Sequence, residues 1–278
     1  MNTELDAEID TETQAPAPPW PHDFSPPPST TPDFSRRDFA LRELMDEPCT
    51  YATYRAAALS LARLNRWTRG YKPTLDFLTR VLQHTGVTHE PLHIVDAACG
   101  HGDTLRHISR WAAKRSIPLR LTGIDINPYA ARLARERDRQ EHIAPATITW
   151  LTADIFTTTL TTTLARPADI LLSSLFAHHL SDEAIPKLLH WNQTTARTAW
   201  LISDLRRSQR AANTFAWLTK LLPLHHMVTH DAQISFRRAL SLQEWQAHCL
   251  QTNITAQIKD TGTGRLTVER INHSTPSS

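Results

Sequence analysis

Acidic residues end several of the β-strands that the sequence predicts, and a histidine pair follows one strand. The acids at or just past strand ends are Asp96, Asp125, Asp154 and Asp204. In open α/β sheets, ligands bind beyond the carboxyl ends of the strands. Carboxylates there accept hydrogen bonds, and histidines such as His178 and His179 can move a proton near neutral pH. We therefore expect one site at this sheet edge that combines ligand binding with acid–base chemistry.

A loop of small residues follows the first of these acids. The chain there is Asp96-Ala97-Ala98-Cys99-Gly100-His101-Gly102-Asp103, and a helical pattern begins at Thr104. Glycines let the backbone approach a ligand closely, and a helix N-terminus offers unpaired N–H groups. Asp125, after the second strand, is placed to accept hydrogen bonds from ribose hydroxyls. Asp154, after the third, is placed to accept one from the amine of adenine.

Three nucleotide-like ligands compete for this loop. A phosphate-binding P-loop needs Gly-Lys-Ser/Thr, whereas this chain has Gly102-Asp103-Thr104. A dinucleotide loop needs a third glycine where Leu105 stands, and Asp103 would repel a pyrophosphate. S-adenosylmethionine carries a sulfonium, an ammonium, a ribose and an adenine but no phosphate, so it suits Asp96 and Asp103 better. The sequence favours this cofactor, with NAD as the alternative.

The same segments resemble the class I S-adenosylmethionine-dependent methyltransferases, from Leu92 to Arg270. The matching motifs are Asp96-Ala97-Ala98-Cys99-Gly100-His101-Gly102, Gly123-Ile124-Asp125-Ile126-Asn127-Pro128, Ala153-Asp154-Ile155, and the run from Asp169 to Leu180. The resemblance implies that the cofactor binds at Asp96, Ala98, Gly100, Gly102, Asp125, Ile126, Asp154, Ile155 and Ser173. One departure is Ala98, where the family often has glycine, and its Cβ is expected to crowd the methionine portion.

Methyl transfer to a hydroxyl or an acidic carbon needs a base, and histidine suits that role at neutral pH. The favoured candidate is His179, with one of the pair expected to face the pocket and the other to pack, and the further candidates are His178 and His230, the last beside Asp231. Packed, helix-capping or solvated histidines are the alternative interpretations. No third ligand at a suggestive spacing accompanies the histidine pair, so the sequence predicts no metal.

The predicted reaction is methyl transfer to a small, mostly apolar acceptor at O or C. Similarity to bacterial small-molecule methyltransferases, loosely of the quinone-biosynthesis type, suggests phenolic, quinone-like or polyketide-like acceptors by analogy. An NAD-dependent oxidoreductase and a catalytically silent methyltransferase-like binding module are the alternatives. Nucleic acid is a poor candidate, because the net charge is only +2 and Ser173-Ser174-Leu175-Phe176 replaces the signature of amino-group DNA methylation.

Arginine pairs and one tryptophan have two interpretations each. Arg206-Arg207 and Arg237-Arg238 are expected either to bind an anionic substrate or to pair with acids. Trp67 is expected either to line the pocket beneath a helical cap or to pack in the core.

Short β-rich runs alternate with helical runs from Leu92 onward, which predicts an α/β, doubly wound, mostly parallel sheet of seven strands. The expected strands are Leu92–Asp96, Leu119–Asp125, Thr147–Thr152, Asp169–Ser174, Thr198–Asp204, Ile254–Lys259 and Arg265–Arg270. The expected helices between them are near Thr104–Arg115, Pro128–Gln140 and Asp182–Thr194. A short turn at Gly262–Gly264 makes the last two strands a hairpin, which gives the sheet an antiparallel edge strand.

Composition shifts divide the 278 residues into three parts. Residues 1–35 are polar and proline-rich, which predicts a disordered tail. Residues 36–90 form an N-terminal helical cap, and residues 91–273 form the methyltransferase domain. Its insertion, 205–240, is expected to hold a helix from Ala211 to Leu222 and then a polar, histidine-rich loop.

Three scattered cysteines, an acidic N-terminus and the lack of a long apolar run predict a reducing, cytoplasmic location without a membrane span.

Overall fold

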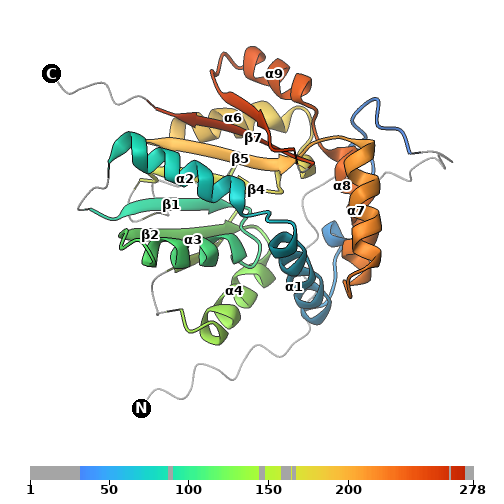
Figure 1. Ribbon diagram of the computed structural model, residues 1–278, viewed down its shortest axis with the longest axis horizontal. Coiled ribbons are helices and arrows are strands. Elements are labelled where there is room, and N and C mark those ends of the chain that lie inside the picture. Colours follow the sequence, from blue (N-terminus) through green and yellow to red (C-terminus); the bar gives the residue numbers. More distant parts are fainter. Residues whose placement is uncertain are drawn as a thin grey trace.

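The computed structural model describes residues 32–86, 90–143, 148–157, 164, 167–262 and 264–272 (Figure 1). Residues 1–31 of the predicted disordered tail, 1–35, lie outside the described residues. Within the described part of that segment, Phe34 packs beside a small apolar cluster around Leu205 and Phe236.

Seven strands form one sheet in the order β3-β2-β1-β4-β5-β7-β6, which confirms the predicted fold class. The strands are β1 Leu92–Ala97, β2 Leu119–Asp125, β3 Ile148–Thr152, β4 Ile170–Ser174, β5 Ala199–Leu205, β6 Gln257–Asp260 and β7 Arg265–Ile271. The first five are parallel, and β7 runs antiparallel to both β5 and β6. The antiparallel strand therefore lies one position inside the edge, which β6 occupies.

Helices cover both faces of the sheet and form two apolar layers. One layer packs α2 (Lys72–Thr85), α3 (Asp103–Ala113) and α4 (Pro128–Gln140) against residues such as Ile94 and Leu121. The other packs α6 (Ala184–Thr195) and α9 (Leu242–Gln251) against residues such as Val95 and Trp200. Neighbouring strand residues point to opposite faces, so buried parallel strands need apolar residues at nearly every position.

A third group of helices lies beside the carboxyl ends of the strands (Figure 1). It comprises α1 (Tyr51–Trp67), α7 (Gln209–Lys220) and α8 (His226–Arg238), and α8 also contacts a short 3-10 turn, η1 (Leu44–Asp46). A segment that precedes β1 and a segment inserted between β5 and β6 thus meet at this edge of the sheet.

The structure corrects the prediction of a histidine-rich loop in the insertion, because this segment is the helix α8. His225 caps it by accepting a hydrogen bond from the Met227 N–H group. The pattern is hidden in the sequence because the buried face of α8 mixes Met227 and Phe236 with Asp231 and Arg238. Charged residues on an inner face remove the apolar periodicity by which a helix is recognised.

Smaller differences concern one side chain and two segments. Trp67 neither lines a pocket nor packs in the core, because 66% of it is exposed. The helix α9 lacked a predicted counterpart, although Ser241 and Glu244 form a capping box at its start. The strand β6 begins at Gln257 rather than Ile254, because the Ile254 N–H group bonds back to the carbonyl of Cys249.

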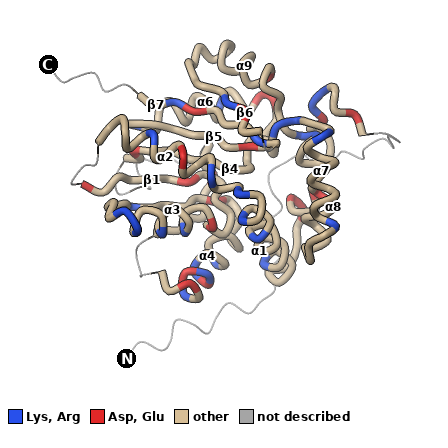
Figure 2. Tube along the Cα trace, in the orientation of Figure 1, with Lys and Arg blue, Asp and Glu red and all other residues tan. Residues whose placement is uncertain are grey.

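Acidic and basic residues are interspersed on α4, whereas α1 carries basic residues and no acidic ones (Figure 2). None of the described helices is long and apolar enough to cross a membrane.

Candidate active site

A cavity of about 520 Å³ lies at the carboxyl edge of the sheet. Its walls come from the loops after β1, β2 and β4, from α1 and α8, and from residues 43–49. Its volume is typical of small-molecule sites, which span roughly 300–1,000 Å³. The site therefore forms where strand polarity and the added helices together enclose space.

The glycine loop and Asp125 form one end of this cavity and are tied to each other. Asp125 accepts hydrogen bonds from the N–H groups of Gly100 at 2.8 Å and Asn127 at 2.9 Å. The Cys99 N–H group bonds to the carbonyl of Ile124 at 3.0 Å. Burial raises the pKa of Asp125, although these two N–H donors lower it. The carboxylate thus has a fixed orientation and keeps further acceptor capacity toward the cavity.

The two loop glycines have different roles. Gly100 has φ +53°, lines the cavity, and no atom lies within 4 Å of where a Cβ would be. Gly102 has φ +75°, and a Cβ there would lie 1.9 Å from the ring of Trp150. Gly102 is therefore needed for packing against Trp150, while Gly100 leaves open space for a ligand.

Backbone strain is found at the ends of two adjacent strands, β1 and β4. Ala98 and Leu175 both line the cavity and both have φ +54°, in the left-handed region that favours glycine. Strained residues of this kind are held in place by their surroundings and are common at ligand sites. Alanine at position 98, where the resembled family often has glycine, therefore has a conformational cost at the cavity wall.

Asp96 lines the cavity with an unsatisfied carboxylate. Only 2% of Asp96 is exposed, and its Oδ1 atom is buried without a hydrogen-bond partner. Burial, with the nearby charges of Asp103 and Asp125, raises its pKa well above the ordinary value. Asp103 accepts a hydrogen bond from the Tyr71 hydroxyl at 2.5 Å. This group of acids favours a cationic ligand, which would supply the missing partner of Asp96.

The predicted cofactor residues divide into two sets. Those that line the cavity are Asp96, Ala98, Gly100, Asp125 and Ile126, while Gly102, Asp154, Ile155 and Ser173 do not line it. Ile155 packs in the apolar layer with Val95 and Ile124. The Asp154 carboxylate accepts a hydrogen bond from the Phe156 N–H group. Cofactor contacts at both sets remain predictions, and only the first set lines the cavity.

His178 lines the cavity and forms a tightly held pair with Asp204, and we call this part of the site the histidine end of the cavity. The ring Nδ1 of His178 lies 2.6 Å from Asp204 Oδ1, and its backbone N–H group donates to Asp204 Oδ2 at 2.8 Å. Burial opposes ionisation of Asp204, but His178 and the N–H group of Leu205 outweigh it and lower the pKa of this carboxyl group. A carboxylate on Nδ1 fixes the tautomer that leaves Nε2 as an acceptor.

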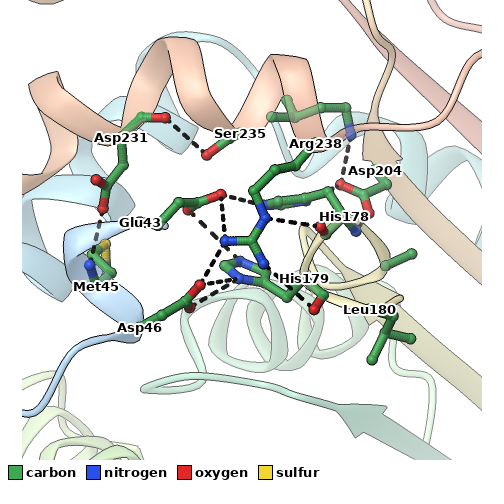
Figure 3. A network of polar contacts seen from close by, with 12 residues as sticks. Glu43, Met45, Asp46, His178, His179, Leu180, Asp204, Asp231, Ser235 and Arg238 are labelled. Atoms are coloured by element: carbon green, nitrogen blue, oxygen red, sulfur yellow. Dashed lines mark hydrogen bonds and ion pairs between the residues drawn. The ribbon is translucent and has the colours of Figure 1, made fainter. Parts of the chain in front are cut away.

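His179 belongs to a different network, which Figure 3 shows around the guanidinium of Arg238. His179 Nδ1 lies 3.0 Å from Asp46 Oδ1, and Arg238 Nη1 lies 2.7 Å from Asp46 Oδ2 and 3.6 Å from Glu43 Oε1. Burial lowers the pKa of His179, but Asp46 and Glu43 outweigh it and raise the value to about 9. His179 is therefore a cation at neutral pH.

Glu43 faces both histidines, although the sequence analysis did not single out this residue. Its Oε1 lies 3.8 Å from His178 Nε2, and its Oε2 lies 3.9 Å from His179 Nε2. Both separations exceed hydrogen-bond length, and Oε1 is buried without a hydrogen-bond partner. Glu43 Oε1 therefore keeps its acceptor capacity beside His178.

Glu43 also adds a third possible metal ligand to the histidine pair, which the sequence did not predict. The ligand atoms of Glu43, His178 and His179 lie within 4.8 Å of one another. The guanidinium of Arg238 and the protonated ring of His179 already balance the charge of Glu43 and Asp46. Positive charge this close competes with a divalent cation for the same carboxylates.

His230 does not line the cavity, and half of its side chain is exposed. Its ring lies 2.8 Å from Asp231, which does line the cavity. Asp231 also accepts hydrogen bonds from the N–H groups of Leu44 at 2.8 Å and Met45 at 3.0 Å. The pair therefore fixes η1, and with it Glu43, over the cavity.

Each of the four arginines in the two predicted pairs contacts an acid. The ion pairs are Arg206–Asp260, Arg207–Glu244, Arg237–Asp38 and Arg238–Asp46. Of the two interpretations of these arginines, the structure supports pairing with acids.

Residues 94–199 match a protein family described as a methyltransferase domain. Among solved structures, the plantazolicin methyltransferase BpumL in complex with SAH has a TM-score of 0.57 and 16% identity, over 79% of this chain and 95% of that one. The methyltransferase domain of the citrinin polyketide synthase has a TM-score of 0.51 and 13% identity, over 74% of this chain and 52% of that one. At such low identities the likeness shows the fold alone. No curated protein sequence is significantly similar to this chain.

Proposed function

Because the chain carries a methyltransferase domain of the class I S-adenosylmethionine-dependent type, we propose that it methylates a small, mostly apolar acceptor at oxygen or carbon. The phenolic, quinone-like or polyketide-like classes remain the acceptors to test. The BpumL structures, which contain azole-bearing substrate analogues and SAH, support a small-molecule acceptor for this architecture.

One observation carries this proposal. A single cavity has the unsatisfied carboxylate of Asp96 and an open glycine at one end, and a carboxylate-oriented histidine at the other. The first end suits a cationic, phosphate-free cofactor, because Asp96 lacks a partner and Gly100 leaves its surface open. Asp125 would hold the ribose, and Asp96 with the loop backbone would hold the methionine end. When bound there, the cofactor supplies an electrophilic methyl group on a sulfonium.

His178 is the base that the geometry favours. Its Nδ1 proton is held by Asp204, so its Nε2 lone pair is free to accept a proton from an acceptor hydroxyl or acidic carbon. Asp204 stabilises the imidazolium that this transfer produces. His179 is less suited to the role, because its raised pKa keeps it protonated at neutral pH. Its charge can instead stabilise an anionic acceptor oxygen.

The walls of the cavity position the acceptor and exclude water. Phe176, Leu175, Val228 and Phe215 supply apolar surface around the histidine end. Alignment of the two reacting groups supplies much of the rate enhancement in a displacement of this kind, up to about 7–11 kcal/mol in well-oriented systems.

Titration calorimetry with SAH, followed by mass spectrometry of products from a phenol and quinol panel, tests the function. We expect SAH to bind and at least one panel member to gain a methyl group. Absence of SAH binding by the folded chain would refute the proposal. Binding without any methylated product would favour the silent binding module.

A further inference from the structure

A buried arginine with no part in the proposed methyl transfer lines the same cavity. Arg265 begins β7 and pairs in the sheet with Leu205, the last residue of β5. Only 6% of Arg265 is exposed. Among the described residues, the guanidinium makes one hydrogen bond, from Nη2 to Asn65 Oδ1 at 2.8 Å.

Arg265 differs from the other buried arginine side chains in its lack of a counterion. Arg37, Arg106, Arg207 and Arg238 each form an ion pair with a carboxylate. Within the described part of the chain, no carboxylate lies within 4 Å of a nitrogen of Arg265. Burial lowers its pKa, and the charges of Asp204 and Asp103 offset this only through space. A buried charge without a paired group is costly, so such a group usually has a ligand to bind.

The surroundings of Arg265 fix the position of its guanidinium. A Cβ on Gly70 would lie 2.9 Å from Arg265 Nη2, so the glycine leaves the space that the guanidinium occupies. Asn65 at the end of α1 holds the same nitrogen. The backbone of Arg265 is held by β5 on one side and by Thr261, whose N–H group bonds to its carbonyl at 3.0 Å. The remaining N–H donors therefore form a preorganised fork at the cavity wall.

We propose that Arg265 binds a carboxylate group of a molecule in this cavity. A guanidinium matches a carboxylate with two parallel N–H···O bonds, which gives both affinity and orientation. A phosphate suits the site less well, because Asp96, Asp103 and Asp125 line the same cavity and repel a dianion. The inference rests on the proposed function, which supplies two sources of a carboxylate: the amino-acid end of the cofactor, or an acceptor.

The cofactor source is tested with a pair of ligands that differ in the amino-acid end. SAH carries the carboxylate, whereas methylthioadenosine has the same adenosine and sulfur without it. If the cofactor supplies the carboxylate, Arg265→Gln will weaken SAH about 10- to 100-fold and leave methylthioadenosine unchanged. The variant Gly70→Ala, which displaces the guanidinium and keeps its charge, should weaken SAH in the same selective way.

The acceptor source is tested on the SAH-saturated protein with 4-hydroxybenzoate and its uncharged analogue 4-hydroxybenzamide. If an acceptor supplies the carboxylate, the wild-type protein will prefer the benzoate, and Arg265→Gln will abolish that preference without changing SAH affinity. The variant Arg265→Lys keeps the charge but loses the fork, so it should retain only part of the preference.

The inference is wrong if Arg265→Gln changes neither the SAH affinity relative to methylthioadenosine nor the benzoate preference. This result is distinct from failure of the proposed function, in which the wild-type protein would not bind SAH at all. Thermal unfolding of each variant separates a binding effect from a folding defect. We expect Arg265→Gln to unfold at or above the wild-type temperature, because it removes a buried charge without a counterion.

Discussion

The two ends of the cavity are built in different ways. The glycine-loop end comes from short continuous segments, 96–103 and 125–128, which follow adjacent strands β1 and β2. The histidine end joins Glu43, His178, Asp204 and Arg238, which are far apart along the chain (Figure 3). A motif can encode the first end, whereas only the fold can assemble the second.

The two ends also differ in how their charges are balanced. Burial raises the pKa of Asp96 and of Asp125, and neither acid forms an ion pair with a described residue. At the histidine end, Asp46 and Asp204 have cationic or histidine partners that lower the pKa of both. The acids of the glycine-loop end therefore have no cationic partner among the described residues, and a cationic ligand would supply one. The histidine end is already neutralised and offers a proton acceptor.

The largest expected effect separates catalysis from cofactor binding. We expect His178→Asn to lower kcat about 100- to 10,000-fold on any acceptor found, with SAH affinity unchanged. His190→Asn is the matched control, since this histidine is exposed on α6 and does not line the cavity. Equal losses in both variants would contradict the assignment of His178.

The charge balance at the histidine end predicts a pH-dependent stability. Because folding raises the pKa of His179 from 6.5 to about 9, its contribution is complete below pH 6.5 and is lost as the pH rises through 9. The loss should be about 3 kcal/mol in the free energy of unfolding, measured in urea. The variant His179→Gln should flatten the curve over this interval. An unchanged curve would show that the pairs with Asp46 and Glu43 do not stabilise the fold.

The glycine-loop end is tested by Asp125→Ala, which removes the carboxylate expected to hold the ribose. We expect SAH affinity to fall about 10- to 100-fold, as measured by calorimetry. His178→Asn serves as the control with intact binding. If Asp125→Ala bound SAH normally, the two ends would not have the separate roles proposed here.

The smallest effect concerns strain at the same end. Ala98→Gly should stabilise the protein by about 1 kcal/mol, because glycine accepts φ +54° without a Cβ penalty. Ser116→Gly has the same φ outside the cavity and should give a similar gain. A loss of stability in Ala98→Gly alone would show that the methyl group of Ala98 packs favourably.

Strand positions could be predicted from the sequence because runs such as β4 and β5 are rich in apolar residues and because helices or turns separate the strands. Leu92–Ala97 and Leu119–Asp125 differ from expectation by one residue at most. The helix α8 was missed because Asp231 and Arg238 are on its buried face. The polar contacts that make such burial possible include distant residues, which are Leu44 and Met45 for Asp231 and Asp46 for Arg238, so no local window of sequence contains them.

The sequence by itself determined the sheet, the loop after β1 and the cofactor class, because these depend on hydrophobic periodicity and on a few residues next to strand ends. Only the tertiary structure decided which histidine has a free nitrogen, since that depends on Asp204 for His178 and on Asp46 for His179. It also decided that Glu43 faces the histidines and that Arg265 forms no ion pair with a carboxylate of the described residues. Burial and pairing of charges follow from packing between segments, and packing is a property of the folded chain.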